Sequence, residues 1–218
     1  MKDKPNEWVS ISDLMAGVMA VVMLLLVMSV LQKTYSDLKH KQEMEKSTTS
    51  QRETVNHMLT DLKQSLSGTA NEGLVAIDVN AQKLTLRDGV FSRGSACITD
   101  QAKQAFISIE ARVSDFLSEF PNGKVYVEGH TDNLPVSRPV TNFDAYCTVY
   151  DDNFTLSAAR AREARKLIIG TLDTAMARRV VVAGYGDSQP IPGIPPEDAQ
   201  QRRIEVLWTV QSNDTDKP

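Results

Sequence analysis

The sequence predicts an α+β chain with a single N-terminal transmembrane helix, a helical linker and one domain of alternating strands and helices. Three observations predict this architecture. An apolar run occupies 9–31, a polar and helix-favouring stretch occupies 32–68, and from 69 onward the apolar residues alternate between strand and helix periods. A chain of 218 residues, 41% of them hydrophobic, has room for one membrane helix and one domain of ordinary size.

These patterns divide the chain into five segments. We expect a short tail at 1–8, the transmembrane helix at 9–31, the linker at 32–68, the folded domain at 69–211 and a flexible tail at 212–218. The formal net charge of −4 argues against direct nucleic-acid binding, because that function needs a basic face.

The apolar run contains one ionisable residue, Asp13. As a helix, the run is long enough to cross a hydrocarbon core of roughly 30 Å. A carboxylate inside such a helix costs about 2.5–3.5 kcal/mol on insertion scales, so it should face a protein partner or a water-filled path. This favours a proton or ion site. Alternatively, Asp13 lies in the headgroup region, because it follows the interfacial residue Trp8 by only roughly 7 Å of helix.

Small residues favour close packing of this helix against another. Ala16 and Ala20 form a small-xxx-small pair, and Gly17 lies one turn after Asp13. A cleaved signal peptide fits less well, since the apolar run is long, contains an acid and is followed by no small-residue cleavage site.

The end of the linker carries an apolar stripe. Val55, Leu59, Leu62 and Leu66 recur at 4-3-4 spacing. This spacing is typical of a short coiled-coil seam, through which the linker would self-associate. It is equally typical of an amphipathic helix that packs on its own domain. The sequence leaves both interpretations open.

The sequence pattern of the folded domain predicts a βαβαβ layer with helices on one face of a mixed sheet. Strands at 74–79 and 83–87 form a plausible hairpin, and further strands are expected at 124–129, 178–184 and 204–210, with a helical turn at 195–203. A helix from Thr99 to Phe120 has one apolar side, formed by Ala102, Ala105, Phe106, Ile109, Val113, Phe116 and Leu117. A second helix is expected from Leu156 to Leu172, with Asn153 and Thr155 as possible caps.

Four motifs fall in the order seen in the OmpA-like peptidoglycan-binding domain. They are GHTDN at 129–133, NFTLSAARA at 153–161, GYGDSQP at 184–190 and QRRIEV at 201–206, and FSRGSA at 91–96 resembles the family's entry motif. The resemblance covers 85–210. Two features depart from the family pattern: a long insertion between Asn133 and Asn153, and Gln201, where the family usually has Asn. We therefore assign no role to Gln201.

The resemblance implies a ligand site. The family's ligand is the zwitterionic end of a diaminopimelate stem peptide. By motif position, Asp132 would meet its ammonium group, and Arg160 would meet its carboxylate as a planar bidentate partner. Thr131, Asn153 and Leu156 belong to the same peptidoglycan site by resemblance. From the residues alone, Asp132 could equally serve a turn and Arg160 a solvated helix face.

The whole layout resembles the MotB class of stator subunits. This resemblance implies a dimer in the inner membrane with a cytoplasmic N-terminus and a periplasmic C-terminal domain, although more lysines follow the apolar run than precede it. It also implies that Asp13 carries protons between the dimer and a multi-span membrane partner. The apolar run is most similar to that of the ZorB group of the Zorya anti-phage defence system, whose partner is ZorA. A flagellar stator subunit and a passive wall anchor are the alternatives.

The predicted periplasmic location of the domain bears on the redox state of its two cysteines, Cys97 and Cys147. In an oxidising compartment, a disulfide between them is the favoured interpretation, and it would tie the insertion to the segment before the first helix of the domain. Two buried free thiols are the alternative.

Enzymatic activity is not expected. His130 has no nucleophilic residue near it in the sequence. His40 and His57 lie in the linker, where no spacing of metal-ligating residues accompanies them. Neither cysteine has a redox or zinc spacing. We therefore expect no catalytic residue, no metal and no cofactor.

Overall fold

The structure, a computed structural model, describes residues 7–68 and 73–211, and of the side chains of 7–11 and 13 nothing is described. The chain divides into two compact units, one ending at Ser50 and one beginning at Gln51. The helices are α1 (Glu7–Leu66), α2 (Asp100–Glu119), α3 (Phe143–Tyr146), α4 (Asn153–Ile168) and α5 (Thr174–Ala177), with 3-10 turns η1 (Asp88–Val90) and η2 (Ala199–Gln201). The strands are β1 (Val75–Asp78), β2 (Lys83–Arg87), β3 (Gly123–His130), β4 (Val180–Gly184) and β5 (Arg203–Val210).

The first unit consists of the N-terminal part of α1. From Leu14 to Leu31 its side chains are exposed and almost all apolar, and this stretch is long and apolar enough to cross a membrane, at about 27 Å for a rise of 1.5 Å per residue. The predicted roles of Trp8 and Asp13 concern side chains outside the described part of the structure.

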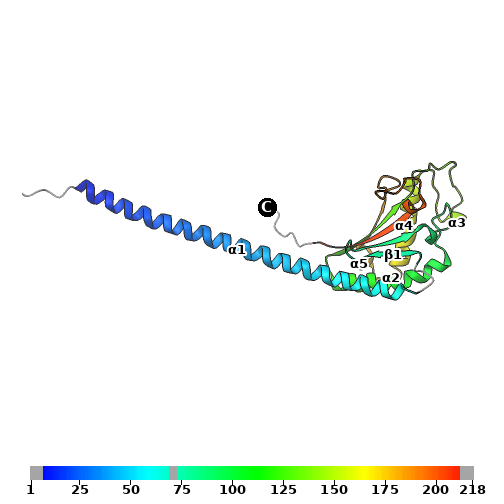
Figure 1. Ribbon diagram of the computed structural model, residues 1–218, viewed down its shortest axis with the longest axis horizontal. Coiled ribbons are helices and arrows are strands. Elements are labelled where there is room, and N and C mark those ends of the chain that lie inside the picture. The colour runs from blue at the N-terminus through cyan, green and yellow to red at the C-terminus, as the bar shows by residue number, and fades with distance from the viewer. Residues whose placement is uncertain (1–6, 69–72, 212–218) are drawn as a thin grey trace, which may run out of the picture. The chain divides into compact units, whose positions relative to one another are not determined.

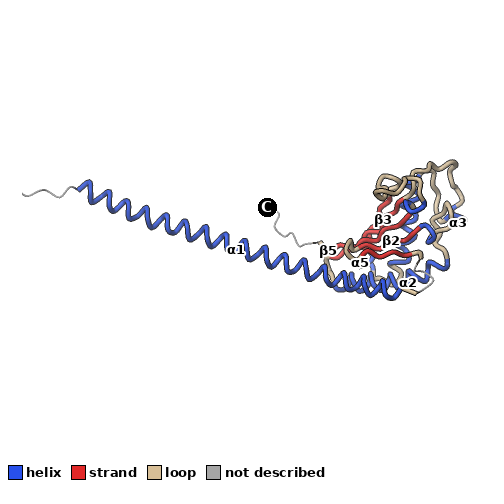
Figure 2. The backbone as a smooth tube through the Cα atoms, viewed as in Figure 1, coloured by secondary structure: helices blue, strands red, loops and turns tan. Residues whose placement is uncertain are grey.

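The second unit is built on one mixed sheet of five strands in the order β1-β2-β5-β3-β4 (Figure 2). β3 and β4 are parallel, and the other neighbouring pairs are antiparallel. β1 and β2 form the predicted hairpin, in which Asp78 pairs with Lys83. The mixed α/β fold predicted from the sequence is therefore confirmed.

Helices α2 and α4 cover one face of this sheet (Figure 1). The seven apolar residues predicted for one side of α2 are its seven buried residues. Together with inward-facing residues such as Val125 and Val127 of β3 and Ile204 and Val206 of β5, they form one core. Each such side chain contributes about 1.5–3 kcal/mol when fully buried.

The last turns of α1 also belong to this core. The stripe residues Val55, Leu59, Leu62 and Leu66 are all buried there. Of the two interpretations left open by the 4-3-4 spacing, packing on the chain's own domain is the one found. The compact domain consequently begins at Gln51, earlier than the expected position 69.

A pair of glycines allows α4 to lie directly on the sheet. Gly129 of β3 and Gly184 of β4 are register partners. A Cβ atom at Gly129 would overlap the backbone carbonyl of Ser157, and one at Gly184 would come within 2.6 Å of the Cβ of Ala158. Helix and strands therefore touch through their backbones at this point.

Helix α4 begins earlier than expected, at Asn153, and its N-cap is Asp152. Asp152 Oδ1 accepts a hydrogen bond from the backbone N–H of Thr155 at 2.6 Å. The predicted caps Asn153 and Thr155 are thus wrong. Asp152 binds one of the free N–H groups of the first turn, and its charge is favourable at this end of the helix dipole.

Candidate ligand-binding site

The ends of β2 and β3 and the beginning of β5 lie together at one end of the sheet, and the residues next to them carry the charges of the candidate site. β3 ends two residues before Asp132, and β5 begins one residue after Arg202. Arg203 is the register partner of His130 on one side and of the last residue of β2 on the other. Because β5 lies between β2 and β3, Arg202 comes between Asp132 and Asp88.

Arg202 forms ion pairs with both carboxylates. Its Nη1 donates to Asp132 Oδ2 at 2.6 Å, and its Nη2 donates to Asp88 Oδ2 at 2.9 Å. These hydrogen bonds, first of all the one with Asp88, raise the pKa of Arg202 above its ordinary value. Asp132 Oδ1 accepts from the backbone N–H of Leu134 at 3.2 Å. The carboxylate of Asp132 is therefore held in one orientation and keeps lone pairs for a further donor.

Arg160 reaches the same place from α4. Its side chain is only 3% exposed, its Nε donates to the carbonyl oxygen of Ser95 at 3.0 Å, and its Nη1 lies 3.6 Å from Asp88 Oδ1. The guanidinium also lies over the ring of Phe91, 5.2 Å from the centroid. Burial lowers the pKa of Arg160, and the neighbouring Asp88 opposes that effect. The group stays protonated, because a guanidinium is not deprotonated in proteins.

The five residues predicted for the site fall into two groups. Asp132, Leu156 and Arg160 line one cavity, with Leu156 one helical turn before Arg160 on the same face of α4. Asn153 does not line the cavity, and its Nδ2 donates to the carbonyl oxygens of Asp132 at 3.1 Å and Leu134 at 2.9 Å. Thr131 is buried, and its Oγ1 has no partner among the residues that the structure describes.

The cavity has a volume of about 810 Å³. Its charged lining includes two residues that the sequence analysis missed, Asp88 and Arg202. The predicted insertion supplies much of one wall, which we call the insertion wall and define as the cavity-lining residues Leu134, Pro135, Val136, Ser137, Arg138, Val140, Tyr146 and Tyr150. The cavity thus joins a charged floor to a wall of mixed polarity.

A disulfide attaches the insertion wall to the loop that holds Arg160. Cys97 and Cys147 are bonded, with their Cα atoms 5.1 Å apart, which confirms the predicted pairing. Beside it, the backbone N–H of Ala96 and the Oγ of Ser95 both donate to the carbonyl oxygen of Tyr146 at 3.0 Å. Since the carbonyl of Ser95 accepts from Arg160, the wall and the arginine are fixed against the same short loop.

Gln201, to which no role was assigned, has a structural one. Its side chain is buried, its Oε1 accepts from the N–H of Ile191 at 2.8 Å, and its Nε2 donates to the carbonyls of Ile194 at 3.1 Å and Pro195 at 3.2 Å. Gln201 therefore holds the loop before η2 and does not line the cavity.

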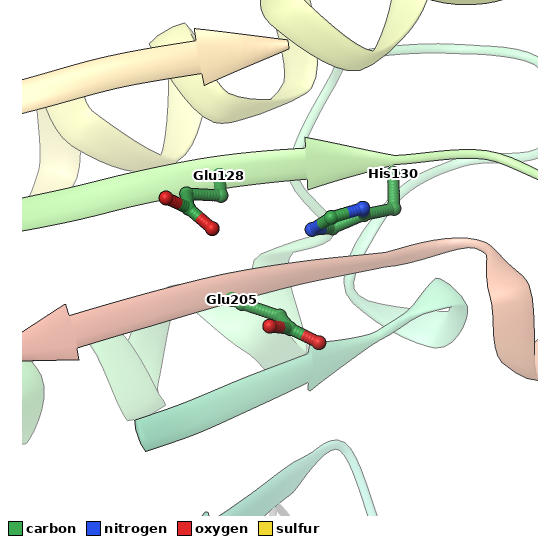
Figure 3. A group of neighbouring side chains, drawn as sticks. All are labelled: Glu128, His130 and Glu205. Carbon is green, nitrogen blue, oxygen red and sulfur yellow. The ribbon is translucent and has the colours of Figure 1, made fainter. Parts of the chain in front are cut away.

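A second cluster of ionisable groups lies beside the site, on the sheet face opposite the core. Glu128, His130 and Glu205 bring their ligand atoms within 4.8 Å of one another (Figure 3). Such a group could hold a divalent cation. However, the two carboxylate oxygens of Glu205 already pair with Lys83 Nζ at 3.2 Å and Arg203 Nε at 2.6 Å. We therefore assign the cluster to an ion-pair network across β2, β5 and β3.

His130 is the buried neutral member of that network. Its side chain is 1% exposed, and neither ring nitrogen has a hydrogen-bond partner in the described part of the chain. Burial, followed by the charge of Arg203, lowers the pKa of His130 from 6.5 to about 4. Burial also raises the pKa of Glu128, whereas the hydrogen bonds with Arg203 and Lys83 hold the pKa of Glu205 down against the effect of its own burial.

Protonation of His130 should destabilise the fold in acid. Between pH 6.5 and pH 4 the unfolded chain binds a proton at this residue and the folded chain does not, so the free energy of unfolding falls as pH decreases through this window. We expect a loss of about 1–2 kcal/mol after allowance for solvent screening. Urea unfolding of the parent and of His130→Gln at pH 7 and pH 4.5 measures it. The variant should lose less stability on acidification than the parent, and His57→Gln, at an exposed position, should behave like the parent.

Comparisons with known proteins bear on the family and the fold of the chain. No curated protein matches the chain. The model of the OmpA family matches residues 90–203, just over half of the chain. A MotB-like protein from Desulfovibrio vulgaris has a similar structure, with a TM-score of 0.57 and 17% identity over 75% of this chain and 98% of that one.

Two further solved structures are similar. The cell wall anchor of the T6SS from Pseudomonas aeruginosa has a TM-score of 0.50 and 27% identity over 69% of this chain and 97% of that one. The periplasmic domain of Helicobacter pylori MotB has a TM-score of 0.44 and 20% identity over 61% of this chain and 75% of that one. The family match covers the loop before α2, the cavity residues from Asp132 to Arg160, and the start of β5. The chain belongs to the OmpA family.

Proposed function

We propose that this chain anchors a membrane complex to peptidoglycan, as a stator-type subunit that binds the cell wall rather than an enzyme. The observation that carries the proposal is the pair of opposite charges, Asp132 and Arg160, on one cavity of about 810 Å³. An acid and a guanidinium at one cavity suit a zwitterionic ligand. The similarity to the T6SS cell wall anchor from Pseudomonas aeruginosa supports a wall-binding role.

The cavity offers both halves of the required recognition. The carboxylate of Asp132 uses part of its acceptor capacity on Arg202 and Leu134, and an ammonium group can take the remainder. On Arg160, Nε and Nη1 face protein oxygens, while no acceptor for Nη2 occurs among the described residues. That nitrogen can therefore bind the carboxylate of the ligand.

The membrane part of the proposal rests on α1. We place the apolar stretch of this helix in the inner membrane as a single span, with the N-terminus in the cytoplasm and the OmpA-like domain in the periplasm, where peptidoglycan lies. In a stator subunit, Asp13 would carry protons in a dimer that is surrounded by a multi-span partner. The fold similarity to the MotB-like protein from Desulfovibrio vulgaris is compatible with this class.

Within this class we favour anti-phage defence of the Zorya type, with a partner resembling ZorA, because the apolar run is most similar to that of ZorB subunits. A flagellar stator subunit of the MotB type is the second candidate. A passive wall anchor, similar in role to the T6SS cell wall anchor, is the third. A neighbouring gene for a multi-span membrane protein would argue against the passive anchor. Adjacent nuclease or helicase genes, rather than chemotaxis genes, would favour defence over rotation.

Charge-specific variants test the binding site. Asp132→Asn keeps the hydrogen bond with Leu134 but removes the charge for the ammonium, and Arg160→Lys keeps a charge but loses the planar fork. Each should lower retention on purified sacculi at least about tenfold, since an unpaired buried charge costs 2 kcal/mol or more. Co-sedimentation of the detergent-solubilised full chain measures this. Asp187→Ala and Arg178→Ala, both at exposed positions away from the cavity, should sediment like the parent. Equal retention of all four variants would disprove the assigned site.

A further inference from the structure

Two exposed arginines in the cavity lining have no carboxylate partner in the part of the chain that the structure describes. Arg93 and Arg138 both line the cavity and are exposed. Neither forms an ion pair within the ranges 7–68 and 73–211. Arg138 lies on the insertion wall, and Arg93 precedes Gly94 in the loop opposite.

The charges that line the cavity do not balance. Its acids are Asp88 and Asp132, and these two pair with Arg160 and Arg202 on the cavity floor. A zwitterionic end of a ligand adds one positive and one negative charge, so it leaves the excess unchanged. Arg93 and Arg138 then remain as an uncompensated positive pair, which favours a further anion.

The insertion wall is held firmly enough to present this pair. Val140 and Tyr150 exchange backbone hydrogen bonds of 2.8 and 3.0 Å, which close the insertion near its end. The hydroxyl of Tyr150 donates to the carbonyl of Gly94 at 2.6 Å, next to Arg93. Together with the disulfide, these bonds join the two sides of the cavity that carry Arg93 and Arg138.

The cavity is also larger than a single charged end requires. Volumes of about 300–1,000 Å³ are those of pockets that enclose a whole drug-sized ligand. A cavity of about 810 Å³ therefore has room for the neighbouring residue of a bound peptide as well as its zwitterionic end.

We propose that Arg93 and Arg138 form a second subsite, which binds the α-carboxylate of the γ-linked glutamate that precedes diaminopimelate in the stem peptide. This inference rests on the proposed function and names a part of the ligand for which nothing else in the site accounts. The glutamate carboxylate is one residue away from the zwitterionic end, and its negative charge can pair with the two arginines. Amidation of this carboxyl group removes that charge, so the subsite distinguishes the free acid from the amide.

The test compares two synthetic tripeptides, L-Ala–γ-D-Glu–meso-diaminopimelate with the glutamate α-carboxyl group either free or amidated. Their dissociation constants are measured by calorimetry on the full chain in lipid nanodiscs at low salt. The parent should bind the free acid about fivefold more tightly than the amide. This ratio corresponds to the upper end of the free energy that an exposed ion pair contributes. The Arg93→Gln/Arg138→Gln double variant should bind both peptides with the affinity that the parent shows for the amide. Arg178→Gln removes one charge elsewhere and should keep the preference.

The outcomes separate this inference from the function on which it rests. Equal affinity of the parent for both peptides overturns the second subsite and leaves wall binding standing. A preference that persists in the double variant overturns the assignment to Arg93 and Arg138. If the parent binds neither peptide, the proposed function fails and the subsite fails with it. Asp132→Asn should lose both peptides whichever form is used.

Discussion

Replacing Gly129 with alanine is expected to destabilise the domain by about 3–5 kcal/mol. The added methyl group would overlap the backbone carbonyl of Ser157, and a backbone atom cannot rotate away as a flexible side chain can. Either α4 or β3 must therefore move. Because α4 carries Arg160 and β3 leads into Asp132, the same displacement would separate the two charges of the binding site.

Urea unfolding of the full chain in detergent, followed by near-ultraviolet circular dichroism, measures this effect. Gly73→Ala is the matched control, since a Cβ atom there meets no atom of the described residues within 4 Å. It should change the unfolding midpoint little, or raise it slightly by restricting the unfolded chain. An unchanged midpoint for Gly129→Ala would show that α4 and the sheet are not in the backbone contact described.

Asp13→Asn is expected to abolish ion-driven activity while leaving the protein assembled. Asparagine has nearly the same shape as aspartate but cannot bind and release a proton, so a proton path through this position would stop. This prediction follows from the only acid in the apolar run and from the proposed stator function. The measurement is protection against phage, or rotation, in cells that carry the chain together with its multi-span partner.

The matched control for this variant is Asp37→Asn, an identical change on α1 at an exposed position beyond the apolar stretch. It should retain full activity. Membrane fractionation and sacculus retention should be the same for both variants, since the wall-binding domain is untouched. Full activity of Asp13→Asn would eliminate the motor interpretation and favour the passive anchor.

Local patterns predicted most of the fold, because they report burial directly. The period of α2 identified its buried face residue by residue, and the alternation at 74–79 and 83–87 identified the first hairpin. Local patterns could not determine which of two chemically similar surfaces a stripe packs against, or which of several suitable residues caps a helix. The stripe from Val55 to Leu66 has the same spacing whether it meets a second chain or its own sheet. Likewise, Asp152 and its neighbours Asn153 and Thr155 are all competent helix caps.

The binding site was predictable only where motifs carried it. Asp132, Leu156 and Arg160 were identified from resemblance and meet on one cavity. Asp88 and Arg202 were missed because their approach depends on strand order. Arg202 is 114 residues from Asp88 and 70 from Asp132, and only the placement of β5 between β2 and β3 brings the three together. No local signal in the sequence gives that order.

The interior position of β3 in the sheet has a mechanical consequence. β3 pairs with β5 along eight register positions and with β4 along five, and it leads directly into the loop of Asp132. Tension applied to a bound wall and directed along β3 would load the hydrogen bonds of both neighbours at once, in shear. An edge strand pulled across its axis would instead lose its bonds one after another, as a zipper opens. In the proposed wall anchor, the loop of Asp132 thus follows an interior strand that is bonded on both sides, and not an edge strand.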